Sequence, residues 1–134
     1  MNPRDWCVPK GSFGDPSAVT RHWEPPLSET ELPLFRAAVV QHAIAISVRR
    51  WKNAHDRMTQ DQLATLDKAD GRPGSNVVEW NARLNGRRTI TLVDIAVIIR
   101  HLPEAMPAED FISTLLRVAE KETPRPTWWS EVDS

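Results

Sequence analysis

Residue types that catalyse reactions or bind metals are few in this chain, and their spacing does not assemble a reaction centre. The single cysteine, Cys7, has no second cysteine with which to share a metal ion or a disulfide. The sequence contains no glycine-rich phosphate loop, no nucleophile elbow and no paired-histidine zinc motif. We therefore predict no enzymatic activity, no metal and no cofactor. We expect four scattered histidines to be surface or interfacial side chains: His22, His42, His55 and His101.

Polar and cationic side chains are instead concentrated between residues 75 and 88, within a basic part of the chain. Residues 49–102 carry ten basic and six acidic groups, whereas residues 103–134 carry three and seven. Residues 1–48 carry four and five. A net charge of +4 in the middle favours a polyanionic partner there, and a net charge of −4 disfavours one at the C-terminal end.

The length and composition predict one soluble domain with additional chain. The 134 residues are 40% hydrophobic and 26% charged, which is enough apolar material for a packed core. The longest uninterrupted apolar stretches, such as Ile95–Ile99, are far shorter than the roughly 20 residues of a membrane-spanning helix. The N-terminus has no apolar core of the signal-peptide type. We expect a cytoplasmic protein that does not interact with membranes.

The first 33 residues contain six of the 11 prolines and show no helical or strand periodicity. This composition predicts an irregular, extended arm over residues 1–32. Two tryptophans in it, Trp6 and Trp23, would anchor an arm that docks on the domain. A partly mobile tail is the alternative.

A long helix is predicted to begin near residues 29–33 and to run to about His55, because Ser28-Glu29-Thr30-Glu31 has the form of a capping box. Two overlapping apolar stripes along it predict burial on more than one side. The first stripe contains Ala37, Val40, Ile44, Val48 and Trp51, and the second contains Phe35, Val39, Ala43 and Ile46. The cations beside Trp51 are expected to form a solvated face: Arg49, Arg50 and Lys52.

Three shorter helices follow in the prediction. Thr59-Gln60-Asp61-Gln62 is a second capping box, which opens a helix to about Lys68. Ser75 is expected to cap the next helix, which Gly86 ends. Its inward residues would be Val77, Trp80 and Leu84. Thr91 would cap a fourth helix over residues 92–102.

An amphipathic fifth helix is predicted from about Ala108 to Glu122, followed by an acidic tail. The fold class is therefore all-α. We divide the chain into the arm at 1–32, a helical domain at 33–106, and the fifth helix with its tail at 107–134.

The stretch from Val48 to Leu102 resembles the Xre/Cro-type helix-turn-helix domain of bacterial and phage repressors. The matching residues are Val48 and Trp51, then Thr59-Gln60-Asp61-Gln62-Leu63-Ala64, the helix from Ser75 to Asn85, Gly86-Arg87-Arg88, and finally Leu92, Ile95, Ile98 and Leu102. The resemblance covers about 55 of the 134 residues. It implies a five-helix fold and a repressor-like regulator of transcription, which reads double-stranded DNA in the major groove and is associated with the nucleoid.

The resemblance also implies roles for individual residues. Base edges in the major groove would be read by Ser75, Asn76, Glu79 and Arg83, with Ala82 as a possible addition. DNA phosphates would be contacted by Thr59, Gln60, Arg87 and Arg88.

This sequence departs from the family pattern in two places. The turn at residues 67–74 is longer than usual and would tilt the recognition helix or add a wing-like loop. The apolar surplus of residues 34–47 favours a homodimer that uses the first helix, the face of the fifth, or both. The residues assigned to the dimer or to a protein partner are Leu115, Leu116, Trp128 and Trp129.

A protein-binding adaptor is the competing hypothesis. It would keep the helix-turn-helix scaffold and hold another protein through its apolar helices and tryptophan-rich ends, because exposed aromatic pairs are favoured interface anchors. The basic middle of the chain favours DNA binding over this alternative.

Overall fold

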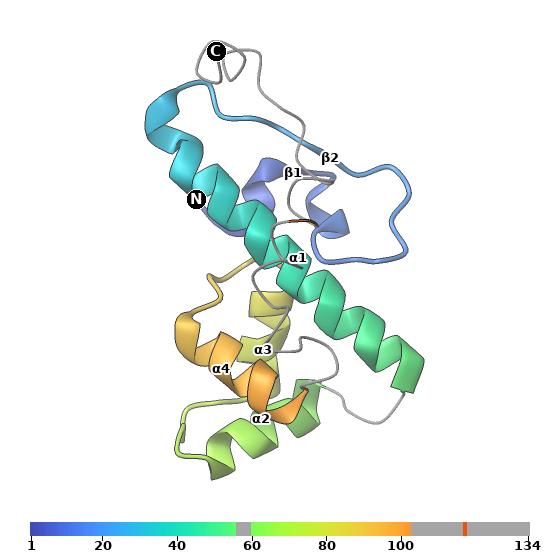
Figure 1. The fold of residues 1–134 in the computed structure, drawn as a ribbon, viewed down its shortest axis with the longest axis vertical. Helices are drawn as coiled ribbons and strands as arrows, with labels where there is room; N and C mark the ends of the chain where they lie inside the picture. The colour runs from blue at the N-terminus through green and yellow to red at the C-terminus, as the bar shows by residue number, and fades with distance from the viewer. Residues whose placement is uncertain (56–59, 103–116, 118–134) are drawn as a thin grey trace.

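A long helix, α1 (Leu32–His55), forms the axis of the molecule in this computed structural model (Figure 1). The structure describes residues 1–55, 60–102 and 117. The N-terminal arm lies above α1 in Figure 1, and three shorter helices lie below it. These are α2 (Gln60–Ala69), α3 (Val77–Leu84) and α4 (Leu92–His101).

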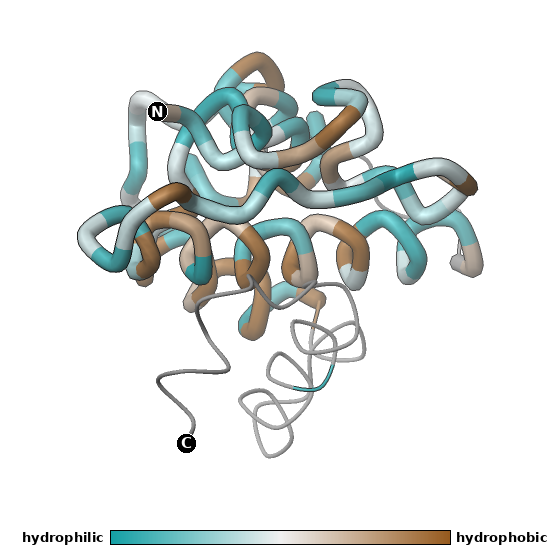
Figure 2. Tube along the Cα trace, turned by 90° about the horizontal axis from the view of Figure 1, so that it is seen from above, coloured by the Kyte–Doolittle hydropathy of each residue, from teal (hydrophilic) through white to brown (hydrophobic). Residues whose placement is uncertain are grey.

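The prediction of burial on more than one side of α1 is confirmed. Residues 41–46 of α1 are all buried, which is more than a full turn of the helix. Figure 2 shows hydrophobic and hydrophilic residues alternating along α1 while the arm runs beside it. The arm of the same chain thus covers apolar surface of α1 from which a homodimer was predicted. At the start of α1, the Ser28 hydroxyl lies 2.9 Å from that of Thr30 and makes no capping hydrogen bond.

The N-terminal arm is docked on α1 by a few short elements, and the chain between them is irregular, as predicted, over residues 13–21 and 24–28. Strand β1 (Cys7–Val8) pairs antiparallel with β2 (His22–Trp23), so that Cys7 lies opposite Trp23. Short 3-10 helices at Pro3–Trp6 and Lys10–Ser12 flank β1, and a third at Glu29–Glu31 leads into α1. Trp6 and Trp23 are 5% and 3% exposed, as expected for docked anchors.

Among the described residues, the core is one cluster that includes residues from the arm and from α1, α2, α3 and α4. Aromatic rings from the arm pack edge to face against α1, with the Trp6 and Phe35 ring centroids 5.7 Å apart. His42 of α1 lies among them, fully buried, with its ring centroid 5.1 Å from that of Trp23. The expectation of a surface or interfacial histidine is therefore wrong for His42.

Two predicted helix ends are confirmed. Thr91 caps α4 through a reciprocal box with Asp94, and α4 ends at His101, one residue earlier than expected. Gly86 follows the end of α3 with a φ of 74°, a left-handed conformation that favours glycine. The predicted cap of α3 is wrong, because Asn76 takes that position instead of Ser75.

By length and composition alone, Glu29–Ala54 would pass for a membrane span, with a mean hydropathy of 1.2. Just over half of its most apolar 18-residue segment, 56%, is buried inside the protein, and the core helix of a soluble protein has the same properties. Thr59, the tail and, apart from Arg117, the predicted fifth helix lie outside the described residues, so the roles of Leu115, Leu116, Trp128 and Trp129 stay predictions.

Candidate functional site

Helix α3 lies with one side in the core and the other in solvent. Trp80 and Leu84 are fully buried, as the periodicity predicted, and Val77 is half-buried. On the opposite side Val78 is 70% exposed. Ala82, four residues after Val78, lies on the same side of the helix and is half-buried. Val78 is thus the one exposed residue of α3, and the helix can present it to a partner without leaving the core.

Ser75 is internal, which corrects the expectation that it points outward. Its side chain donates a hydrogen bond to Asp67 Oδ2 at 2.7 Å and accepts one from Trp80 Nε1 at 3.1 Å. Asn76, the next residue, is exposed, and its Oδ1 accepts a hydrogen bond from the Glu79 backbone N–H at 2.9 Å. Of these two predicted base-reading residues, only Asn76 lies on the surface.

Arg83 is also internal, which corrects a second expectation. Its side chain is only 14% exposed, and its Nε lies 3.2 Å from Asp94 Oδ2. Its guanidinium lies 5.1 Å from the ring centroid of Trp80, close enough for a cation–π interaction. Arg83 thus joins α3 to α4, and a side chain held this way cannot reach a base edge.

The long turn between α2 and α3 is held by buried charges. Arg72 lies between two carboxylates, with Nε 3.2 Å from Asp67 Oδ2 and Nη2 2.8 Å from Asp94 Oδ1. Asp67 and Asp94 are 1% and 0% exposed. We call Asp67, Arg72, Arg83 and Asp94 the ionic clamp. It closes the turn against the start of α3, where the sequence suggested a tilted helix or a wing.

Sequence reasoning missed the clamp, although one signal for it was present. Asp67 follows Leu63 and Ala64 at helical spacing, so a carboxylate stands on the buried face of α2. A buried carboxylate requires a partner, and Arg72 is the nearest cation in the following turn.

A shallow hollow beside the clamp is lined by Gly71, Arg72, Pro73, Gly74, Ser75, Glu79 and Arg83.

Arg87 and Arg88 are exposed just beyond the end of α3, where the resemblance placed them. Their backbone N–H groups both donate to the Ala82 carbonyl, at 2.9 and 3.3 Å, so the loop folds back onto the helix. The Arg88 guanidinium pairs with the Glu79 carboxylate, which also lies 3.9 Å from Arg83 Nη2. Glu79 is therefore engaged with two arginines, and its predicted contact with a base stays a prediction.

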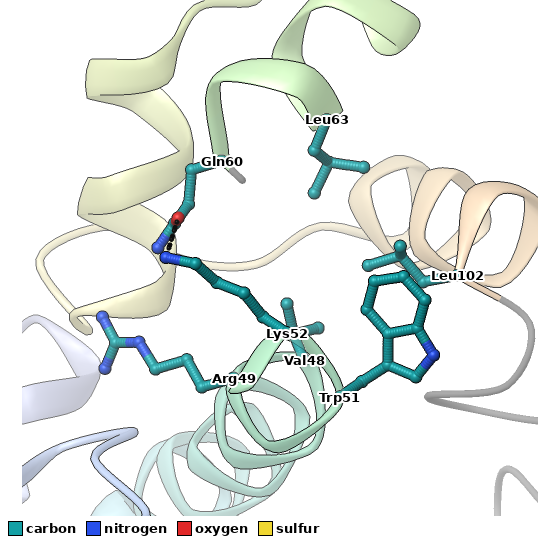
Figure 3. A pocket seen from close by; sticks show the side chains of 7 residues that line it. All are labelled: Val48, Arg49, Trp51, Lys52, Gln60, Leu63 and Leu102. Atoms are coloured by element: carbon teal, nitrogen blue, oxygen red, sulfur yellow. Dashed lines mark hydrogen bonds between the residues drawn. The ribbon is translucent and has the colours of Figure 1, made fainter. Parts of the chain in front are cut away.

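Gln60 and two cations of α1, Lys52 and Arg49, make hydrogen bonds within the protein. They also line a small pocket (Figure 3). Lys52 Nζ donates to Gln60 Oε1 at 3.0 Å. Arg49 donates to the Phe13 carbonyl at 3.4 Å and also to the Asn85 side chain. The predicted solvated face is thus wrong for Arg49 and Lys52, whereas Arg50 is exposed.

Within the described residues, no group of three histidine, cysteine, aspartate or glutamate side chains could hold a metal ion. His42 is held neutral by its surroundings: burial, with smaller contributions from Arg21, Arg50 and Arg49, lowers its pKa to about 3. Comparisons of the chain with protein-family models, with curated proteins and with solved structures give no match.

Proposed function

We propose that this protein is a sequence-specific DNA-binding regulator of the helix-turn-helix type, which inserts α3 into the major groove. One observation carries the proposal. Trp80 and Leu84 hold one side of α3 in the core, and the other side exposes Val78. The exposed Arg87 lies just beyond the end of the helix. A recognition helix requires this division between a packed side and a presented side.

The proposed contacts differ from those implied by the sequence alone. Asn76 and Val78 face the base edges, where the Val78 methyl groups suit the methyl group of thymine. Arg87 and Arg88 contact phosphates. Ser75 and Arg83 do not touch DNA in this proposal, because both are engaged in holding the start of α3 and its packing on α4.

A selection from a random pool of duplexes, with the purified protein at two salt concentrations, tests the proposal. We expect an enriched consensus at both concentrations and weaker binding at the higher one, because phosphate contacts release counterions. Absence of enrichment even at low salt would refute sequence-specific DNA binding.

The same selection tests a homodimer, which stays part of the proposal. A two-fold symmetric consensus with half-sites about one helical turn apart is the result expected of a dimer. The apolar surface of α1 no longer argues for that dimer, because the arm covers much of it. A consensus without symmetry would indicate that the protein binds as a monomer.

A protein-binding adaptor remains the second candidate because of exposed apolar residues on α4. Leu92 and Val93 are 84% and 54% exposed at the start of that helix. The charge argument against an adaptor is also weaker, since Arg83 is internal and Arg88 is paired with Glu79. The adaptor would be favoured by one outcome of the double substitution L92S/V93S. In that outcome the protein loses its function in cells while its affinity for duplex DNA is unchanged.

A further inference from the structure

The arm contacts the C-terminal end of α3 directly. The Arg4 backbone N–H donates to the Gly86 carbonyl at 3.1 Å. A Cβ atom at Gly86 would lie 2.7 Å from the Phe13 ring and 2.9 Å from Arg4 Cβ, distances that no real side chain tolerates. The arm therefore packs on the backbone of the residue that ends α3.

A second glycine makes the reciprocal contact from the arm. Gly14 has a φ of 67°, and a Cβ atom there would lie 2.6 Å from the Leu84 carbonyl oxygen at the end of α3. Its N–H donates to Nδ1 of His42 at 2.8 Å. We call Arg4, Phe13, Gly14, Asn85 and Gly86, together with Arg49, the arm seam.

Arg49 connects the two sides of the arm seam. Its guanidinium donates to the Phe13 carbonyl of the arm and to the side chain of Asn85, the residue that caps the end of α3. A few residues further on, the Ile90 backbone N–H donates to Gln41 of α1 at 2.7 Å. The loop at residues 86–90, which carries Arg87 and Arg88, is thus held at both ends.

We propose that the N-terminal arm is a positioning element for DNA binding, and that Arg49 is the residue through which it fixes the loop carrying Arg87 and Arg88. This inference rests on the proposed function. A loop already held in its binding geometry loses little conformational entropy on contact with phosphates, so its affinity for DNA is higher. Arg49 acts through the loop and does not touch DNA.

The test compares R49M with R50M, which removes the same charge from the next, exposed position of α1. Affinity for a duplex obtained by the selection is measured by fluorescence anisotropy. We expect R49M to weaken binding about tenfold more than R50M, the size of effect that follows from losing a charge-assisted hydrogen bond. N85A, which removes only the acceptor on α3, should weaken binding in the same direction if R49M fails to fold.

A double-mutant cycle with R87A separates positioning from a general loss of structure. If Arg49 works by placing Arg87, the R87A change should weaken binding less in the R49M protein than in the natural one. Additive effects, or equal effects of R49M and R50M, would overturn the inference while leaving DNA binding intact. A natural protein that binds no duplex at low salt would instead overturn the proposed function, and this inference with it.

Discussion

Two groups of contacts hold α3 by different physical means. The ionic clamp joins α2, the long turn and α4 to α3 through buried carboxylates and arginines, one of which, Arg83, lies in the last turn of α3. At the C-terminal end of α3 the arm seam depends on two glycines that allow the backbone of the arm and that of α3 to approach closely. Removing a charge should therefore destabilise the ionic clamp. Adding an atom at one of the glycines should destabilise the arm seam.

Neutralising one member of the ionic clamp should give the largest effect. D94N leaves Arg72 and Arg83 without their shared charged partner inside the protein, and we expect it to lower the free energy of unfolding by about 3 kcal/mol. Urea denaturation measures this change, with D61N at an exposed position of α2 as the control. A loss below about 1 kcal/mol would mean that the ionic clamp does not hold the start of α3.

Adding one methyl group to the arm seam should give the next largest effect. We expect G86A to cost about 2 to 3 kcal/mol, because it combines a strained positive φ with a steric clash against Phe13. Gly71 also has a positive φ, 114°, but has no neighbour within 4 Å, so G71A measures the strain alone. Equal costs for the two variants would contradict close packing in the arm seam.

Acid should weaken the arm seam through His42. The folded-state pKa of His42 is lowered to about 3 from its ordinary value of 6.5, so the unfolded state binds more protons between these values. Stability therefore falls as the pH drops below about 6.5, by about 2 kcal/mol between pH 7 and pH 5. Thermal denaturation at the two pH values checks this, and H42Q should remove most of the difference. An unchanged pH dependence in H42Q would assign the effect to other groups.

Helix ends could be predicted because their signals are local in the sequence. Contacts between residues far apart in the sequence could not be predicted. Thr91 with Asp94 and the glycine at 86 were identified because a cap and a stop depend on residues close in sequence. The contact of Arg83 with Asp94 was not, because an arginine at the edge of the apolar stripe of a helix is equally compatible with solvent. Val78 was missed because an apolar residue type suggests the core, although its position opposite Trp80 indicates exposure.

The smallest effect should come from Glu79, which lies between the ionic clamp and the surface proposed to face DNA. E79Q removes a negative charge from the proposed interface and releases Arg88 from its carboxylate partner. We expect about threefold tighter binding to specific and to scrambled duplexes alike, with a stability change below about 0.5 kcal/mol. Anisotropy titrations measure both affinities, and weaker binding of the specific duplex would instead assign Glu79 to base recognition.

The most direct test of the account is to map the DNA-binding surface by the amide chemical shifts of the protein as the selected duplex is added. We predict large changes at Asn76, Val78 and Arg87, and none at Val19 or Leu27, which are 93% and 97% exposed on the arm. Changes centred on the arm, with Val78 and Arg87 unaffected, would contradict the claim that α3 and the loop after it form the surface that meets DNA.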